Sequence, residues 1–233
     1  MAALSHSQQL RSKINLVRSR LDEATYNLWN HPRLTEIYPE YLFQNHSVTR
    51  ASVPLMEAAL LCARTKFTSD PVAIGAANYL AKHIPEERGH DDWLVEDMTH
   101  MGMNPSIVLK RMPSLAAATL VGAQYYWINH FHPVCLLGYI AVLEGTPPTI
   151  PYFKRVVERS NLPKQALSSL FRHARLDPQH RADLDEAIDA LPLTAEHTEI
   201  LGMSALQTVY LLTRVIKDLV ASAPGKVTVA AIA

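Results

Sequence analysis

The chain is poor in cysteine, with only Cys62 and Cys135 among its 233 residues. Both cysteines lie in apolar stretches that are far apart in the sequence. Two isolated cysteines make neither a disulfide framework nor a zinc site of the usual spacing. The scarcity of cysteine therefore excludes a disulfide-stabilised scaffold and a zinc-finger module.

An excess of charge of one sign is also missing, because 22 Lys and Arg residues balance 22 Asp and Glu residues. This balance argues against binding to nucleic acid or to an anionic membrane surface. No uninterrupted apolar run reaches membrane-spanning length, and the chain begins without a signal peptide. We therefore expect a cytoplasmic protein that binds neither nucleic acid nor membrane.

A third absence is the alternation of apolar and polar residues that marks a half-buried strand. Apolar residues make up 48% of the chain, as in globular proteins, and most prolines and glycines fall where helices could end. The sequence predicts an all-α fold in a single domain over residues 1–233, with a core from about 7 to 222 and a flexible tail over 225–233. The predicted helices cover residues 7–29, 39–66, 71–101, 114–130, 133–144, 151–160, 164–190 and 195–222, with a short helix after Asn104-Pro105.

What the chain does contain is the segment from His173 through Asp177 to His180, an imidazole, a carboxylate and an imidazole at i, i+4 and i+7. On a helix these three positions share one face. Mixed nitrogen and oxygen ligands of this kind suit iron or manganese. As a buried core the same face would be unfavourable, since it would bury a charge that needs a partner.

Two further segments complete a metal-binding inventory. Glu87 and His90 form a carboxylate and imidazole pair at i, i+3, and Glu144 is the only charge in an apolar helical segment. Three carboxylates and three imidazoles on separate helices suit two divalent metals in a helical bundle. Two dications bring four positive charges and the three carboxylates three negative charges, so one positive charge remains. A hydroxide, a peroxide or a substrate carboxylate could neutralise it.

The order and type of these residues resemble the haem-oxygenase-like diiron oxidases, the iron-containing redox enzymes. That family combines E-x-x-H on one helix, a lone Glu on a second and H-x-x-x-D-x-x-H on a third. The resemblance covers roughly residues 30–215 and extends to the sequences around the ligands, over 83–91, 138–145 and 173–194. It identifies the metal ligands as Glu87, His90, Glu144, His173, Asp177 and His180.

The resemblance implies a helical bundle of about seven core helices and two iron ions that react with dioxygen as co-substrate. It further implies a peroxo-diiron(III) intermediate that oxidises a small organic substrate derived from an amino acid or a fatty acid. Carbon–carbon cleavage, desaturation and N-oxygenation, in the biosynthesis of a specialised metabolite, are all open outcomes. A homodimer is compatible with such a fold.

Several prolines and acidic residues affect this interpretation. Pro178 lies inside the third motif and removes a backbone donor, so Asp177 and His180 are expected to be the looser ligands. Pro85 is expected to kink the helix just before Glu87, and Pro54 to bend the preceding one. The acidic residues Asp91, Asp92, Glu96 and Asp97 are expected to form a solvated face.

The substrate side is less well defined by the sequence. Arg50, Lys154 and Arg155 are alternatives for binding a substrate carboxylate, with solvated surface as the other interpretation. His83 lies seven residues before His90 and either joins the pocket or is a histidine satisfied locally. The candidates for the substrate pocket are Met56, Glu57, Tyr125, Tyr126, His130 and His132.

Other functions fit parts of the pattern. A ferritin-like diiron protein would use Glu57 as a ligand and would not need His173. A metal-free binding or scaffold protein on the same fold would bind no iron and consume no dioxygen. A cofactor-free oxidase would not need the extra carboxylates on core helices. A thiaminase-like enzyme would use Cys135, but apolar neighbours raise the pKa of a thiol and argue against it.

Overall fold

The computed structural model describes residues 3–145 and 149–222, and no strand occurs within these ranges. The all-α prediction is confirmed. The tail predicted to be flexible, 225–233, lies outside the described residues. The helices are α1 (His6–Val17), α2 (Ser19–Trp29), α3 (Leu34–Thr49), α4 (Ser52–Lys66), α5 (Pro71–Glu87), α6 (His90–His100), α7 (Pro105–Val108), α8 (Leu115–His130), α9 (Cys135–Leu143), α10 (Ile150–Arg159), the 3-10 helix η1 (Lys164–Leu167), α11 (Ser168–Ala190) and α12 (Ala195–Ala221).

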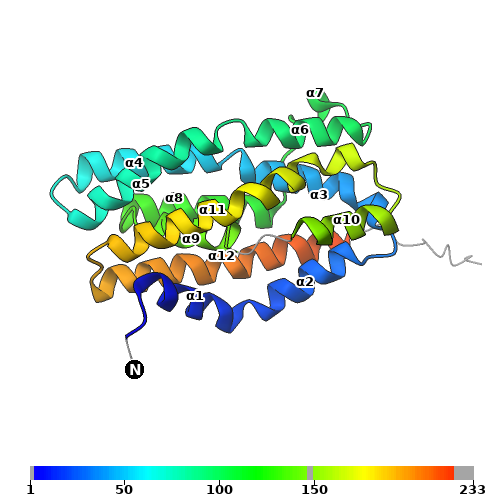
Figure 1. The fold of residues 1–233 in the computed structure, drawn as a ribbon. Helices are drawn as coiled ribbons and strands as arrows, with labels where there is room; N and C mark the ends of the chain where they lie inside the picture. The colour runs from blue at the N-terminus through cyan, green and yellow to red at the C-terminus, as the bar shows by residue number, and fades with distance from the viewer. Residues whose placement is uncertain (1–2, 146–148, 223–233) are drawn as a thin grey trace, which may run out of the picture.

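The long helix α12 runs along the whole bundle and packs against α1, α2, α8 and α9 (Figure 1). α1 and α2 follow one another along one side of α12, while α4, α5 and α6 lie on the opposite side of the molecule (Figure 1). α11 contacts α5, α6, α9 and α10 and so links these parts. The helices that carry the predicted ligands therefore meet inside the bundle.

Side-chain caps fix where several helices begin. Ser5 forms a capping box with Gln8 at the start of α1, and Thr194 forms one with His197 at the start of α12. Asp70 accepts hydrogen bonds from the backbone N–H groups of Val72 and Ala73 at the start of α5. Each cap satisfies backbone donors that have no partner within the helix.

Three of the predicted helices are interrupted. The first is divided at Arg18, and the second begins at Leu34 and is divided at Arg50 and Ala51, ahead of Pro54. The third is divided at Arg88 and Gly89, although the kink was predicted at Pro85. Pro85 lies inside α5, and Gly89 has a φ of 87°, a left-handed conformation that ends one helix and starts the next. Pro178 lies inside α11, which continues through it.

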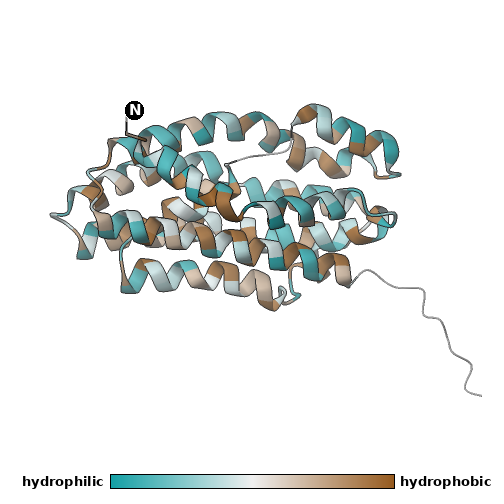
Figure 2. Cartoon of the chain, turned by 90° about the horizontal axis from the view of Figure 1, so that it is seen from below, coloured by the Kyte–Doolittle hydropathy of each residue, from teal (hydrophilic) through white to brown (hydrophobic). Residues whose placement is uncertain are grey.

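The apolar side chains form two main clusters. Leu55, Leu80 and Ile188 belong to the first, whereas Leu42, Leu94 and Leu170 belong to the second. Hydrophobic and hydrophilic residues alternate around most helices (Figure 2), as expected when one face of each helix is buried. On α11 the segment 173–180 lies between Leu170 of one cluster and Leu184 of the other, so the polar ligands occupy the boundary between the two.

One close helix contact depends on a glycine. A Cβ atom added to Gly138 on α9 would lie within 3.1 Å of the backbone nitrogen of Ala205 on α12, and closer still to the carbonyl oxygen of Leu201. Gly138 therefore allows the two backbones to approach and fixes the position of α9, which ends just before Glu144. No described helix is both long enough and apolar enough to cross a membrane.

Candidate metal centre

The break between α5 and α6 places two predicted ligands. Glu87 is the last residue of α5, and His90 is the first residue of α6. The left-handed Gly89 between them turns the chain, so the pair does not lie on one continuous helix. Both side chains are buried, and Nδ1 of His90 lies 3.2 Å from Oε2 of Glu87.

The other predicted ligands come from α9 and α11. Glu144 caps the C-terminus of α9, and His173, Asp177 and His180 follow one face of α11. Asp177 and His180 are buried, whereas Glu144 and His173 are half-buried. Three separate parts of the bundle thus contribute to one polar cluster.

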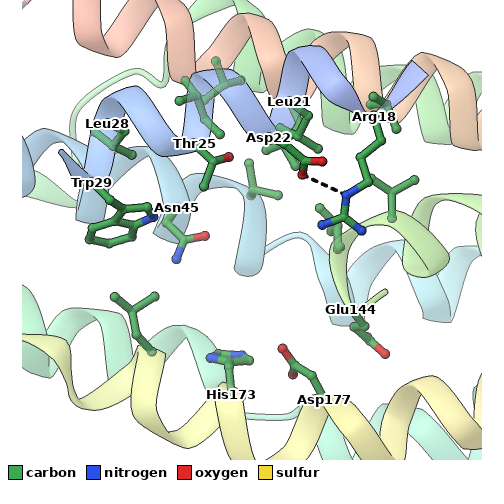
Figure 3. A pocket seen from close by; sticks show the side chains of 18 of the residues that line it. Arg18, Leu21, Asp22, Thr25, Leu28, Trp29, Asn45, Glu144, His173 and Asp177 are labelled. Carbon is green, nitrogen blue, oxygen red and sulfur yellow. Dashed lines mark hydrogen bonds and ion pairs between the residues drawn. The ribbon is translucent and has the colours of Figure 1, made fainter. Parts of the chain in front are cut away.

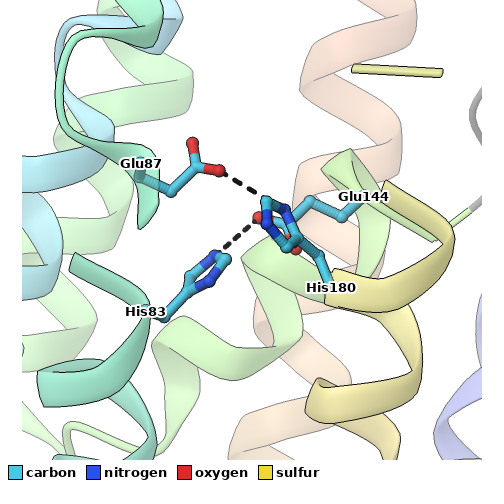
Figure 4. Close-up of side chains that lie close together, drawn as sticks. All are labelled: His83, Glu87, Glu144 and His180. Carbon is cyan, nitrogen blue, oxygen red and sulfur yellow. Dashed lines mark hydrogen bonds and ion pairs between the residues drawn. The ribbon is translucent and has the colours of Figure 1, made fainter. Parts of the chain in front are cut away.

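A first group of donor atoms comprises His83, Glu87, Glu144 and His180 (Figure 4). Nε2 of His83 lies 3.0 Å from Oε1 of Glu144, and Nδ1 of His180 lies 3.5 Å from Oε1 of Glu87. Nδ1 of His180 is also 4.0 Å from Oε2 of Glu144. One atom from each of the four residues lies within 4.8 Å of the others, the proximity that a shared metal ion requires.

A second group comprises Glu87, His90 and His173. Nδ1 of His173 donates a hydrogen bond to the carbonyl oxygen of Ser169 at 2.9 Å. That bond places the proton on Nδ1 and leaves Nε2 free to bind a cation. Glu87 is the only residue common to these two groups, so it is the residue that two bound metals would share.

The residues fit a pair of iron ions. Four buried polar atoms of the cluster have no hydrogen-bond partner among the described residues: His90 Nδ1, Glu144 Oε2, Asp177 Oδ1 and His180 Nδ1. Buried polar atoms are rarely left unsatisfied, because each costs about 1–3 kcal/mol. Contacts of 3.0–3.5 Å match the spacing of neighbouring ligands around one ion, for bonds of about 2.1 Å. Imidazole and carboxylate together form the ligand chemistry of non-haem iron.

The charges of the cluster also point to a cation. Burial, together with the negative charges of Glu144 and Glu87, raises the pKa of Asp177 to about 8. Burial opposes protonation of His83, but hydrogen bonds and charge from Glu144 and Glu86 outweigh it and raise the pKa of His83 to about 9. Three carboxylates in one buried place repel one another, and bound dications would allow all three to ionise.

Asp97 supports the cluster from α6. It is fully buried and accepts hydrogen bonds from the backbone N–H groups of Ser168 and Ser169, at 3.1 and 3.0 Å, and from the Ser169 hydroxyl. These bonds anchor the start of α11, and the carbonyl of Ser169 in turn fixes His173. The prediction that Asp97 belongs to a solvated face is wrong, because its carboxyl is the cap of α11.

A cavity of about 650 Å³ opens onto the cluster. Glu87, Glu144, His173 and Asp177 line it on one side. Across the cavity Thr25, on α2, and Asn45, on α3, face His173 and Asp177 (Figure 3). Much of the remaining wall is apolar and includes Leu21, Leu28, Trp29, Val48, Phe153, Leu170, Leu212 and Ile216. Such a space suits a small organic molecule with an apolar body.

The profile of the iron-containing redox enzymes matches residues 39–211, which include every predicted ligand. The chain belongs to the iron-containing redox enzyme family. The matched segment runs from α3 to α12 and so includes both donor groups of the cluster.

Solved structures are similar to this chain in fold. A domain of unknown function with a haem-oxygenase-like fold from Shewanella denitrificans OS217 is similar, at 17% identity and a TM-score of 0.77, over 94% of this chain and 93% of that one. A TenA homologue from Pseudomonas syringae pv. tomato DC3000 is also similar, at 15% identity and a TM-score of 0.72, over 92% of both chains. At these identities the likeness shows a haem-oxygenase-like fold alone. No curated protein matches the chain.

The predicted substrate residues lie elsewhere in this family member. None of the six lines the large cavity, although Met56 lines a second cavity of about 20 Å³ beside Glu87 and Glu144. Glu57 is exposed and pairs with Arg88, while Tyr126 and His130 are exposed and Tyr125 is half-buried. His132 is buried beside Asp70 and His197, in a separate cluster. Of the three basic residues considered for a substrate carboxylate, Arg155 lines the large cavity, whereas Arg50 and Lys154 do not.

Thr25 and Asn45 were not among the predicted site residues, and the role of His83 was left open. Asn45 lies between Gln44 and His46 in a polar stretch of α3, so the sequence does not single it out. Thr25 gives no indication either, since a threonine on an amphipathic helix is common.

Proposed function

We propose that this protein is a non-haem diiron oxidase or oxygenase that uses dioxygen to oxidise a small organic substrate. The observation that carries the proposal is the pair of donor groups that share Glu87 beside a cavity. Two ferrous ions, when bound, supply electrons that reduce dioxygen and a Lewis-acidic centre for the substrate. The proposed ligands are Glu87, His90, Glu144, His173, Asp177 and His180.

The residues of the chain would prepare the site for this chemistry. Glu87 would link the two ions, and His90 and His173 would fix one of them at the wall of the cavity. Asp177 would complete the set from the same wall, since its Oδ1 atom is buried without a hydrogen-bond partner. The apolar wall would exclude water, which protects an oxidising centre from side reactions.

The cavity supports a substrate with an apolar body and a polar end. Thr25 and Asn45 offer a hydroxyl and an amide opposite His173 and Asp177 (Figure 3). The arginine–aspartate pair of Arg18 and Asp22 also lines the cavity. A fatty-acid or amino-acid derivative fits this distribution, with C–C cleavage, desaturation and N-oxygenation as the reactions we propose to test.

Other functions are supported less well. A ferritin-like site would need Glu57, but this side chain is 53% exposed and pairs with Arg88. A nucleophilic role for Cys135 is disfavoured, because burial raises the pKa of its thiol. A metal-free scaffold would have no use for four buried ligand atoms without a hydrogen bond.

Dioxygen uptake tests the proposal. Anaerobic protein loaded with two equivalents of Fe(II) is mixed with oxygenated buffer, alone and with medium-chain fatty acids or amino acids. We expect uptake tied to the iron loaded and a change in its rate with a substrate of the right class. His173→Ala should abolish the uptake, while Glu57→Gln should retain it. If the loaded protein consumes no dioxygen with any of these compounds, the oxidase function is wrong.

A further inference from the structure

His83 lies at the centre of the polar cluster without belonging to the ligand motifs. It precedes Glu87 by one turn of α5, so the two side chains share a helix face. The imidazole is 2% exposed, and its ring centroid lies 4.8 Å from that of His180. Nε2 of His83 lies 3.0 Å from Oε1 of Glu144 (Figure 4).

The other nitrogen of His83 also faces a carboxylate. Nδ1 lies 3.1 Å from Oε2 of Glu86. Carboxylates only accept, so Nδ1 donates to Glu86, and without metal Nε2 donates to Glu144. A cation bound at Nε2 would replace that second proton, while the bond to Glu86 would hold the ring in place. Histidines that bind metals commonly donate their second N–H to a carboxylate or a carbonyl, which orients the ring and strengthens the ligand. His173 has the same arrangement, with the Ser169 carbonyl as acceptor.

An alternative role for His83 is to orient Glu144 by a hydrogen bond. In that role Nε2 would keep its proton when metal binds, and an imidazolium would lie next to a dication. The geometry favours ligation, because Oε2 of Glu144 and Nδ1 of His180 lie 4.0 Å apart, buried and without a hydrogen bond. A cation between these atoms and Nε2 of His83 would satisfy all of them.

We propose that His83 is a metal ligand, so that the two metal positions are unequal; this inference rests on the proposed diiron function. The inner position has four protein residues, His83, Glu87, Glu144 and His180. The outer position has Glu87, His90 and His173. Glu87 and Glu144 also line the large cavity, but among the imidazoles of the two groups only His173 does. The outer position, with three protein residues and an imidazole at the cavity, would therefore be the more open one for exchange and for substrate, and the inner position would hold its ion more tightly.

Metal titration of the full chain tests the inference without reference to turnover. Metal-free protein is titrated anaerobically with Co(II) and with Fe(II), and X-ray absorption is recorded after two equivalents of Co(II). We expect a tight site and a weaker site, with His83, His180, His90 and His173 giving four imidazoles on the two ions together. Three imidazoles on the two ions would overturn the proposal, and this result requires no variant.

His83→Gln separates the two roles, since glutamine can still donate a hydrogen bond to Glu144 but is a poor metal ligand. We expect the variant to lose affinity at the tight site by at least about 100-fold, beyond the range typical of outer-shell changes. His197→Gln is the matched control in the separate cluster with Asp70 and should leave both sites unchanged. Full affinity in His83→Gln would show that His83 only orients Glu144. If the native chain binds neither metal, the diiron function itself fails.

Discussion

Glu87 is the residue on which the metal centre depends most. It alone belongs to both donor groups, and its two oxygens face His90 on one side and His180 on the other. Burial would raise the pKa of Glu87, but the close contact with His90 outweighs it and lowers the pKa, which favours the ionised carboxylate. A bridging anion at this place allows two dications to lie close together.

Glu87→Gln should therefore remove both metals, because the amide offers one neutral oxygen where two ionised oxygens are needed. After desalting, elemental analysis should find roughly tenfold less iron per chain in this variant than in the native chain, that is about 0.2 ions instead of two. Glu57→Gln is the control, since it removes the carboxylate that a ferritin-like site would use. Loss of iron in Glu57→Gln instead of Glu87→Gln would favour the ferritin-like arrangement.

Asp177 gives the metal-free protein a distinctive pH dependence. Its pKa in the fold is about 8, above the usual value of about 4 for an aspartate. The folded chain therefore binds one more proton than the unfolded chain between these values, and its stability falls as pH rises from about 4 through about 8. Asp177→Asn removes this loss of stability. At pH 8 the free energy of unfolding of the variant should exceed that of the native chain by on the order of 2–4 kcal/mol, and at pH 5 the gain should be smaller.

Urea unfolding of both chains in the presence of a chelator measures this difference. A gain that is the same at pH 5 and at pH 8 would show that the Asp177 carboxyl is not held in its neutral form. Added Fe(II) should reverse the effect at pH 8, because the cation favours ionised Asp177 in the native chain.

At the scale of elements, the break between α5 and α6 decides where the ligands lie. The left-handed Gly89 allows Glu87 to end one helix and His90 to begin the next. An uninterrupted helix would hold these two residues three positions apart on a rigid face. The break adds a change of direction at the point where the two hydrophobic clusters meet.

Gly89→Ala should weaken the fold by about 1 kcal/mol, because a Cβ atom disfavours a positive φ. The added Cβ atom would have space, because its closest contact, Oδ2 of Asp92, is 3.7 Å away. The loss of stability therefore comes from the positive φ of residue 89 and not from a steric clash. Gly102→Ala is the control, since Gly102 has a φ of 76° and nothing within 4 Å of an added Cβ. We expect similar shifts in thermal melting for both variants but loss of iron affinity only in Gly89→Ala. Equal iron affinity would mean that the turn is not needed to place His90.

Asp97 links α6 to the start of α11 and, through Ser169, to His173. Asp97→Asn should place an amide N–H group against backbone donors, at a cost of about 1–3 kcal/mol. We also expect about a 10-fold loss of affinity at the outer metal position, as for other outer-shell ligands. Glu96→Gln removes a charge from the adjacent, exposed residue and should change neither quantity. A destabilised Asp97→Asn with unchanged metal affinity would restrict Asp97 to capping α11.

Helical periodicity and proline positions predicted the all-α fold and most of the segments, because amphipathic faces are encoded locally. The breaks at Arg18 and Gly89 were not predicted, since an arginine or a single glycine is compatible with a continuous helix. The spacing of His173, Asp177 and His180 indicated a shared face, but only tertiary packing brings His83 next to Glu144. The residues of α2 at the cavity were missed for the same reason.

At the scale of the whole molecule, the metal centre lies where two hydrophobic clusters leave a polar boundary. α5, α9 and α11 cross this boundary, and the cavity under α2 and α3 gives access to it. The bundle thus buries three carboxylates and four imidazoles that have few partners of their own. Such an arrangement costs stability unless cations bind, so folding and metal binding should be coupled.

A crystal structure of the protein grown anaerobically with Fe(II), with anomalous scattering measured on both sides of the iron edge, tests the central claim most directly. We predict two iron peaks joined by the Glu87 carboxylate, with His83, Glu144 and His180 on one ion, His90 and His173 on the other, and Asp177 bound to one of the two. A single peak, two peaks that do not share Glu87, or no peak in iron-saturated crystals would contradict the account.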